Sequence, residues 1–377
     1  MAKNRLSPSD RAAVDRLRTE VKDQLTPYYD TDFNLLRWLV GHDYDIDAIK
    51  PKLLNHLLLR KYPEWDLDNM AKSPRCHPVH EHWKEGMTGP AVNTPNTIVT
   101  IEQSGSTDFW GLMATFPGNE MLRARVQDLE IMLSEVMKME AATGERWSIL
   151  FVMDLTDLKL DRRLMGGLES ISSFMAENYV EMIHTFVAVN VPSFMQALWT
   201  IVKPLLPEKT RKKVRLLGSN WKEEILEMAD PSVLPSYWNT EKEKIFTAHI
   251  NRAQQIPTTL HYKGNMPEHS QKMYIKKGKT DYIEDFVREG QTMSYELHAD
   301  GGFAFAVFYS SDRDKDGEDT TKWEKVYPLF QKIPGPTIVP IKDKTRCQKT
   351  GYYRCWISNE HAWVHTLKIV YIFDIMN

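Results

Sequence analysis

The stretch from Trp147 to Trp238 constrains the fold of this chain more than any other segment. Its pattern predicts, in order, a strand at 147–158, a helix at 168–183, a strand at 184–191, an apolar helix at 192–206 and a basic run at 207–221. Two strands joined by a crossover helix pair in parallel, because the chain has to return to the same end of the sheet. The stretch therefore predicts a buried, largely parallel sheet with helices packed on it.

The segments before this stretch fit the same class of fold. Capped helices with apolar stripes predict a small helical bundle from about residue 9 to 62. A strand at 97–103 and a long helix at 121–144, which Gly144 ends, are also expected. The segment 63–95 contains proline, histidine and glycine, and we expect it to be a connector with marginal structure.

The pattern changes after Tyr262, where short alternating runs separated by turn residues replace the helical periods. These runs lie at 281–289, 291–300, 302–311, 323–330, 337–342, 352–358 and 363–375. Many short strands without helices predict an antiparallel β-sandwich. We therefore expect a multi-domain chain with a helical lobe at 1–72, an α/β lobe at 73–240, a linker at 241–264 and a sandwich at 265–377.

Composition limits the compartment and the partners. A net charge of −3 predicts no bulk attraction to nucleic acid or to an anionic membrane. Three scattered cysteines argue against a disulfide framework and favour a reducing compartment. The chain begins without an apolar leader, and the apolar segment 184–202 contains Asn190 and Pro192, which favours strand–turn–helix over a membrane span. The sequence thus predicts a cytoplasmic protein without nucleic-acid partners.

Motifs of catalysis and metal binding are weak or incomplete. The loop from Asp312 to Gly317 begins like a calcium loop, but its twelfth position is Trp323 and strands flank it, so we expect a solvated hairpin tip. Asp154 and Asp157 follow a strand, where catalytic acids can lie, although helix capping and turn formation explain them at least as well. We therefore predict neither an enzyme nor a metal or cofactor site.

The helix at 192–206 is unusual because apolar residues cover most of its circumference. These residues are Phe194, Met195, Leu198, Trp199, Ile201, Val202, Leu205 and Leu206. Such a helix is either a deeply buried core helix or one whose second side faces an apolar partner. The adjacent cations Lys209, Arg211, Lys212, Lys213 and Arg215 favour a membrane contact, while a solvated charged face is the commoner reason for such a run.

At these residues the chain resembles the CRAL-TRIO lipid-binding family. FVMDLTDL, ENYVEMI, the segment from NVPSF to KPLLPEKTRKKV, and LGSNWKEEIL followed by LPSYW match the lipid-binding lobe of that family in order and spacing. FNLLRWL and YDIDAI, within 33–49, are similar to its helical lobe. The segment 270–377 is similar to a GOLD domain, and the tandem resembles the animal supernatant-protein-factor and tocopherol-associated subgroup.

The resemblance implies a bilobed fold in which a lipid lies on the sheet and a mobile gate helix, here 192–206, closes over it. It implies a pocket lined by Ile149, Phe151, Met153, Phe174, Met175, Phe186, Ala188, Met195, Trp199 and Val202. Glu181 and Lys213 match the residues that hold a phosphoinositide headgroup in some members. Phe194, Leu198, Leu205 and Leu206 complete the gate, and Lys209, Arg211, Lys212 and Arg215 would face the membrane.

The chain departs from the phosphoinositide-binding members at several positions. Val40-Gly41-His42-Asp43 stands where those members carry basic residues. Ile149, Phe151 and Met175 stand where choline-binding members carry hydroxyl groups, and Asn93-Thr94-Pro95-Asn96 replaces the usual acidic-glycine turn. These departures favour an apolar ligand, such as a sterol precursor, a tocopherol-like or retinoid molecule, or lipid tails with a weakly held headgroup.

Two functions of different class remain open. The first is a lipid carrier that associates peripherally with membranes. The second is an adaptor, in which the sandwich recruits a protein partner through Tyr352, Tyr353, Trp356 and Trp363. These aromatic residues are equally well explained as the core of the sandwich.

Overall fold

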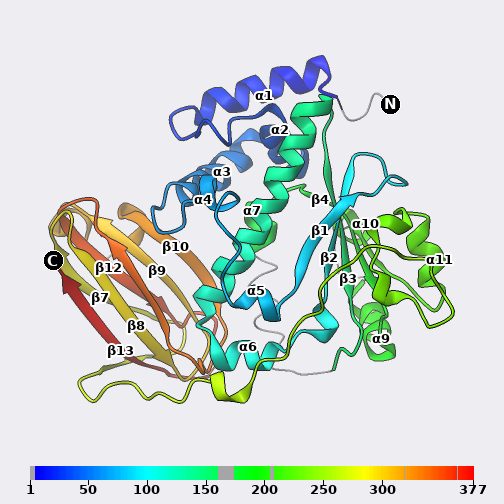
Figure 1. Ribbon diagram of the computed structural model, residues 1–377. Helices are drawn as coiled ribbons and strands as arrows, with labels where there is room; N and C mark the ends of the chain where they lie inside the picture. Colours follow the sequence, from blue (N-terminus) through cyan, green and yellow to red (C-terminus); the bar gives the residue numbers. More distant parts are fainter. Residues whose placement is uncertain (1–4, 160–173, 204–207, 318, 363) are drawn as a thin grey trace.

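The chain is built around one long central helix, with a parallel sheet on one side and a β-sandwich on the other (Figure 1). The computed structural model describes residues 5–159, 174–203, 208–317, 319–362 and 364–377. A helical lobe formed by the N-terminal residues lies over one end of the central helix (Figure 1). Within the described residues, no helix combines the length and the apolar character needed to cross a membrane.

The helical lobe forms where the sequence places caps and apolar stripes. It consists of α1 (Pro8–Val21), α2 (Asp32–Gly41), α3 (Ile46–Arg60) and α4 (Leu67–Met70), and α5 (Val79–His82) follows it. Ser7, Thr31 and Asp45 precede the first three helices, and each side chain accepts a hydrogen bond from a backbone N–H in the first turn. The predicted helical bundle is confirmed.

The sheet of the α/β lobe has five strands in the order β1-β2-β3-β4-β5. The strands are β1 (Glu85–Pro90), β2 (Thr97–Glu102), β3 (Ser148–Asp154), β4 (Ile183–Val189) and β5 (Val214–Leu216). Strands β2 to β5 pair in parallel, as predicted, and β1 pairs with β2 antiparallel at the edge. The prediction of marginal structure at 63–95 is wrong, because α4, α5 and β1 all lie there.

The helices of the α/β lobe connect or follow these strands. They are α6 (Phe109–Thr115), α7 (Gly118–Thr143), α9 (Ser193–Val202), α10 (Glu208–Lys213) and α11 (Trp221–Leu226). Short 3₁₀ turns lie at η2 (Ser104–Ser106), η4 (Pro231–Val233), η5 (Ser236–Trp238) and η6 (Thr258–Leu260). The crossover into β4 is helical at residues 174–178, and the start of the predicted crossover helix lies outside the described residues.

The central helix α7 carries buried and half-buried charged side chains that reach three other parts of the molecule. Arg123 pairs with Asp343 of the sandwich at 2.6 Å, and Arg125 pairs with Glu102 of β2 at 2.9 Å. Two further pairs reach the helical lobe, Glu130 with Arg60 at 2.9 Å and Glu140 with Arg37. Gly144 ends α7 in the left-handed conformation, as predicted.

The C-terminal region is an antiparallel sandwich of two four-stranded sheets, which confirms the predicted architecture. The sheet β10-β9-β12-β7 contains β7 (Thr280–Val287), β9 (Phe303–Ser310), β10 (Glu324–Ile333) and β12 (Gly351–Ser358). The sheet β11-β8-β13-β6 contains β6 (Gln271–Ile275), β8 (Thr292–Ala299), β11 (Ile341–Arg346) and β13 (Leu367–Met376). Between β9 and β10 lie α12 (Arg313–Asp316) and η7 (Thr320–Lys322), where a hairpin tip was expected.

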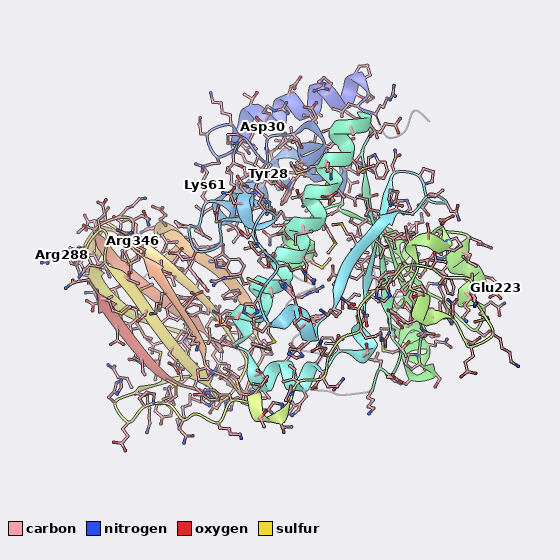
Figure 2. All side chains as sticks on the ribbon, viewed as in Figure 1. Tyr28, Asp30, Lys61, Glu223, Arg288 and Arg346 are labelled. Carbon is pink, nitrogen blue, oxygen red and sulfur yellow. The ribbon has the colours of Figure 1, made fainter. Side chains whose placement is uncertain are left out.

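The sandwich is joined to the helical lobe by a shared hydrophobic core. One cluster of buried side chains contains Leu59 and Trp65 of the helical lobe together with Phe305 and Tyr327 of the sandwich. The Trp65 ring lies edge-on to Tyr327, with the ring centroids 6.4 Å apart. Figure 2 shows the side chains of the helical lobe and of the sandwich where the two parts adjoin, with Lys61 and Arg346 labelled on either side. A flexible tether would leave this surface exposed, so the sandwich is a fixed part of the molecule.

Candidate functional site

The two faces of the parallel sheet pack against different layers. On one face, Ile149, Phe151 and Phe186 belong to a cluster with α7 and the helical lobe. On the other face, Leu150 and Val187 pack with α11 and the segment that follows it. Every strand residue predicted to line the pocket lies on the first face, because alternate residues of a strand point the same way. These residues are Ile149, Phe151, Met153, Phe186 and Ala188.

The two faces differ in how completely they are covered. Val152, Val187 and Val189, which point to the second face, are completely buried. Met153 and Phe186, on the first face, are only half-buried although they lie in the middle strands of the sheet. The first face is therefore covered less tightly by the described residues than the second.

A buried hydroxyl group on the first face was not anticipated from the sequence. Thr100 of β2 lies beside Phe151 of β3 in register and is fully buried. Its Oγ1 atom has no hydrogen-bond partner among the described residues. A buried hydroxyl without a partner is costly and calls for an explanation, such as a ligand or a bound water. Threonine is common in strands, so the sequence carries no signal for this role.

The last turn of the crossover is fixed by the helical lobe and α7. Phe174 and Met175, two predicted pocket residues, are half-buried and pack against the cluster of the first face. Asn178 lies within hydrogen-bond distance of His56 at 3.2 Å, and the Tyr179 hydroxyl donates to Glu130 at 2.8 Å. These contacts hold the chain in position just before the predicted headgroup residue Glu181.

Glu181 and Lys213 are brought together, as the resemblance implied. The Lys213 Nζ atom donates to the Glu181 carboxylate at 2.9 Å and to the backbone oxygen of Ile183 at 3.2 Å. Glu181 has a φ of 53°, which is the left-handed region. Gly41 packs so closely on this turn that an added Cβ would lie 2.2 Å from Val180. The turn with this uncommon conformation is therefore packed tightly against the last residue of α2.

His184 lies near the Glu181–Lys213 pair, and its surroundings favour the neutral form of its imidazole ring. His184 is exposed, but neighbouring atoms remove part of its hydration, and this desolvation, followed by the charges of Lys213 and Arg146, lowers the pKa of His184. At neutral pH this histidine therefore adds no cation to the site, and its ring lies 2.8 Å from the Thr185 hydroxyl.

The described side chains of α9 differ between its two sides, and the prediction of a helix that is apolar nearly all round extends to side chains outside the described residues, so it stays a prediction. Phe194, Met195 and Trp199 are half-buried on one side. The other side is exposed and carries Ser193, Gln196, Ala197 and Thr200. Of the other predicted gate residues, Leu205 and Leu206 lie outside the described residues, as do the side chains of Leu198 and Val202. One half-buried side and one exposed side, among the described side chains, are the pattern of a helix between an interior and solvent.

The cations that follow α9 are paired with acids, which the sequence analysis did not foresee. Lys213 pairs with Glu181 at 2.9 Å, Lys212 with Glu208 at 2.6 Å, Arg215 with Glu224 at 3.4 Å, and Lys209 with Asp43. Among the described residues, no ion pair is seen for Arg211. The Lys212–Glu208 pair has the helical spacing of four and was visible in the sequence, whereas the other acids come from distant segments.

Asp154 has a structural role. Its carboxylate accepts hydrogen bonds from Trp238 Nε1 at 2.9 Å and Asn190 Nδ2 at 3.0 Å, and from the backbone and hydroxyl of Thr156. A carboxylate with this many donors is fully used in holding the end of β3. In the described part of the chain, no group of three His, Cys, Asp or Glu side chains is placed to hold a metal ion.

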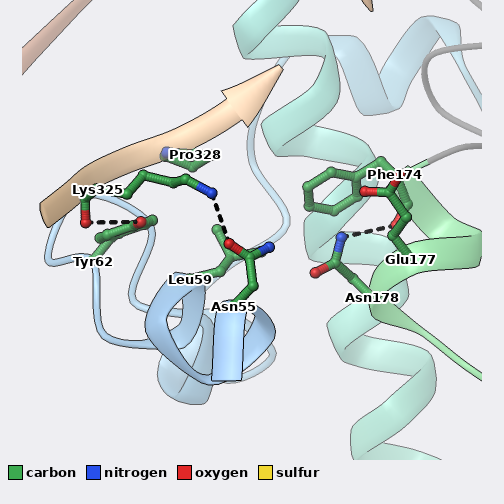
Figure 3. A pocket seen from close by; sticks show the side chains of 8 residues that line it. All are labelled: Asn55, Leu59, Tyr62, Phe174, Glu177, Asn178, Lys325 and Pro328. Carbon is green, nitrogen blue, oxygen red and sulfur yellow. Dashed lines mark hydrogen bonds between the residues drawn. The ribbon is translucent and has the colours of Figure 1, made fainter. Parts of the chain in front are cut away.

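A cavity lies where the helical lobe, the crossover and the sandwich meet (Figure 3). It contains about 390 Å³ of empty space, part of it open to solvent, and Phe174 and Lys325 line opposite sides. The Lys325 Nζ atom donates to Asn55 at 2.7 Å, and the Tyr62 hydroxyl donates to the backbone oxygen of Lys325 at 3.2 Å. Phe174 packs against both the core of the first sheet face and the core shared with the sandwich.

The aromatic residues predicted for the adaptor lie on different sides of the sandwich. Tyr353 is buried in its core. Tyr352 and Trp356 are half-buried on the outer face of the sheet β10-β9-β12-β7, next to Phe308 and Trp323. Trp363 lies outside the described residues.

Comparison with known protein families divides the chain into three matched parts. Residues 98–239 match the CRAL/TRIO domain. Residues 260–377 match a family described as F28H7_8_C-like, C-terminal domain, and residues 6–70 match a domain of unknown function, DUF8435. The description of the family matched by the sandwich does not name GOLD, so the resemblance to a GOLD domain and to the animal subgroup stays a prediction.

Individual proteins are similar to this chain over different shares of its length. The CRAL-TRIO domain-containing protein F28H7.8 of Caenorhabditis elegans is 28% identical over 99% of this chain and 93% of its own length. The phosphatidylinositol/phosphatidylcholine transfer protein SFH4 of Arabidopsis thaliana is 26% identical over 58% of this chain, which spans 37% of that protein. The crystal structure of Sfh5 matches 66% of this chain and 93% of its own, with a TM-score of 0.49 and 15% identity.

Proposed function

We propose, from the premise that this chain contains a CRAL-TRIO domain, that it is a carrier that binds an apolar ligand on the first face of its parallel sheet. Lipid binding and transfer are the activities of this family, and the transfer proteins among the relatives support the same class of function. The finer proposal concerns where the ligand lies, what kind of molecule it is, and how it enters.

The difference in burial between the two sheet faces carries this proposal. Side chains in the middle of a sheet are normally buried on both faces when helices cover both. Met153 and Phe186 stay half-buried on the side that faces α7 and the helical lobe, while Val152 and Val187 are sealed on the other. An apolar ligand on the first face would bury the exposed parts of the Met153 and Phe186 side chains.

The proposed ligand is a mostly apolar molecule with at most a small polar group. Ile149, Phe151 and Met175 offer no hydrogen bond, whereas the unpaired Thr100 hydroxyl offers one on the same face. Glu181 already neutralises Lys213, so a phosphorylated headgroup would have to displace a carboxylate. These features favour a sterol-like, tocopherol-like or retinoid molecule over a phosphoinositide.

The helix α9 is the proposed gate. Its half-buried side, with Phe194, Met195 and Trp199, would cover the ligand, and its exposed side would face water. Carrying a lipid through water requires such cover, since hydrating each methylene group costs about 0.8 kcal/mol. When the gate opens at a membrane, the bilayer would cover the same apolar surface, so entry and release stay reversible.

The direct test is to purify the full chain from cells, extract it with organic solvent and identify the extracted molecules by mass spectrometry. A stoichiometric apolar molecule is expected. Ala188→Trp places a large ring on the first face, next to Met153 in register. This variant should fold but lose at least tenfold in ligand content, because the ring fills the ligand space.

Ala142→Trp, at the exposed end of α7, is the matched control and should keep its ligand. The melting temperature of both variants decides whether the loss reflects folding. If Ala188→Trp unfolds the protein and the wild type carries and accepts no lipid, the first face is packed solid and the carrier proposal fails.

A second candidate function is an adaptor, which the outer face of the sandwich favours. Phe286 is 48% exposed on this face and lies edge-on to Tyr352, which is half-buried like Trp356. Arg354 is buried between the rings of Tyr282 and Trp323, so the outer aromatic rings and not the arginine offer the contact surface. Aromatic residues are enriched in protein interfaces. Deleting the sandwich would expose Trp65 and destabilise the helical lobe, because the two parts share a core. Substitutions on the surface of the sandwich therefore test the adaptor hypothesis better than deletion.

Phe286→Ser and Tyr352→Ser change two side chains that touch each other on this face. Under the adaptor hypothesis, the pair of substitutions abolishes partner capture and the protein transfers no lipid between vesicles. Under the carrier hypothesis, the same variant transfers lipid at the wild-type rate.

A further inference from the structure

An ion pair between Lys209 and Asp43 joins the basic helix α10 to the helical lobe. We propose that an anionic lipid surface competes with Asp43 for Lys209 and thereby releases α10 from the loop between α2 and α3. The inference rests on the proposed function, because a lipid carrier has to meet a membrane in order to load and unload.

The Asp43 side of this contact is rigid. Asp43 and Tyr44 both adopt left-handed backbone conformations, with φ of 53° and 62°. The Tyr44 hydroxyl donates to Asp10 at 2.6 Å, and Gly41 packs on Val180. The loop is therefore anchored on both sides of Asp43, so a change of partner would move Lys209 and α10 rather than the loop.

The Lys209 side is open to solvent. The side chains of Lys209 and Asp43 are 61% and 79% exposed, so an approaching phosphate group can reach the ammonium group directly. α10 is short, and its last residue Lys213 leads directly into β5. Lys212 pairs within the helix, and Lys213 pairs with Glu181 on the pre-β4 turn. Lys209 is thus the cation that ties the start of α10 to the helical lobe.

The paired acids hide most of the positive charge of this surface. Asp43, Glu181, Glu208 and Glu224 oppose four of the cations that follow α9. The closed molecule therefore presents little net charge here, and attraction to a bilayer depends on exchanging a carboxylate for a lipid headgroup. The Debye length of about 8 Å at physiological salt means that this exchange begins only at close range.

The strengths of the two contacts make the exchange reversible. An exposed ion pair such as Lys209–Asp43 shifts the equilibrium between the paired and the separated state by about fivefold or less. A cation next to an anionic bilayer gains about fivefold in affinity. Because these factors are similar, neither state of Lys209 is locked, and the local density of anionic lipid decides which one prevails.

A lipid surface is the partner that the neighbouring helix favours. α9 precedes α10 along the chain and carries Phe194, Met195 and Trp199 on one side. Apolar and aromatic side chains beside cations suit the interface of a bilayer, where both find a favourable environment. The net charge of −3 of the whole chain gives no support to nucleic acid as the competing polyanion.

The test measures binding of the full chain to vesicles of phosphatidylcholine alone and to vesicles that contain roughly a third phosphatidylserine. Asp43→Asn frees Lys209 in advance and is expected to bind the anionic vesicles about fivefold more tightly than wild type, with no change on neutral vesicles. Asp23→Asn removes the same charge from an exposed site in the same lobe and should bind like wild type. Equal binding of Asp43→Asn and wild type, or an equal gain in both variants, would overturn the inference.

Hydrogen exchange of the unmodified protein gives a second readout. Anionic vesicles are expected to speed exchange in α10, at 208–213, while the loop at 42–45 keeps its protection, and Asp43→Asn should do the same without vesicles. If the wild type transfers lipid between vesicles and Asp43→Asn changes neither binding nor exchange, the carrier proposal stands and the proposed competition for Lys209 is wrong. If the protein carries no lipid but Asp43→Asn binds anionic vesicles more tightly, the competition for Lys209 stands and the carrier proposal is wrong.

Discussion

The ion pairs of α7 and those of α10 use the same chemistry in opposite surroundings. Glu130 and Arg60 are fully out of solvent between α7 and the helical lobe, whereas Lys209 and Asp43 are mostly in solvent. A buried pair cannot lose one partner without leaving a charge in the interior, while an exposed charge simply returns to water. The same interaction therefore fixes the architecture at α7 and permits exchange at α10.

Burial also changes what each charge can do. Desolvation lowers the pKa of Arg125, another residue of α7, to about 10, yet it stays charged at neutral pH beside Asp128. Its partners come from β1, β2 and α7 itself. The α7 pairs join elements distant in sequence, so their removal tests whether the three parts of the molecule are one unit.

The largest expected effect comes from breaking the central buried pair. Arg60→Met leaves the Glu130 carboxylate without its guanidinium and should lower the free energy of unfolding by about 3–5 kcal/mol. Urea denaturation followed by circular dichroism measures this loss. The double variant Arg60→Met/Glu130→Met should recover at least half of it, because no buried charge remains.

The matched exposed substitution is Glu208→Gln on α10, which should cost less than about 0.5 kcal/mol. If Arg60→Met were as mild as Glu208→Gln, burial would not be what separates the two regions. If the double variant were as unstable as the single one, the loss would come from packing around Arg60.

A smaller effect is expected from acidification through His56, which lies beside Arg60. Burial, followed by the Arg60 charge, lowers the pKa of His56 to about 3. The unfolded chain takes up a proton below about pH 6.5, while the folded chain stays neutral, so stability falls as the pH drops from 6.5 toward 3. Between pH 7 and 5 this histidine should contribute about 2 kcal/mol of lost stability.

The variant His56→Gln isolates this contribution. Its free energy of unfolding should fall by about 2 kcal/mol less than that of wild type between pH 7 and 5. His249→Gln, at an exposed position, should follow the wild type. Parallel curves for His56→Gln and wild type would mean that His56 takes up its proton in the folded state.

The sequence predicted elements whose signal is local. The parallel strands and most of the sandwich strands showed clear periodicity, and Gly144 marked the end of α7. The edge strand β1 was missed because Glu85–Pro90 contains two glycines and a proline and needs pairing on one side only. The predicted strand at 337–342 was misplaced, since the strand β11 is Ile341–Arg346 and pairs with β8.

The contacts around the candidate site were predictable where residues of one strand share a face, and not where distant segments meet. The resemblance implied that Ile149, Phe151 and Met153 line one pocket, and side-chain alternation along β3 places them on the same face, while their role in binding stays a prediction. The basic run was also visible, but three of its acidic partners lie outside it, at Asp43, Glu181 and Glu224. Spacing along the chain carries no information about such pairs, so the sequence suggested free cations where the fold places ion pairs.

The smallest expected effect is the coupling between Lys209 and Asp43, and its response to salt sharpens the comparison. A double-mutant cycle with Lys209→Gln and Asp43→Asn should give a coupling below about 1 kcal/mol. At about 0.5 M salt this coupling should approach zero, because exposed charges are screened. The coupling of Arg60 and Glu130 should persist under the same conditions, since ions do not enter their surroundings. A Lys209–Asp43 coupling that resisted salt would mean that α10 is held as firmly as α7, and exchange with lipid headgroups would then lose its physical basis.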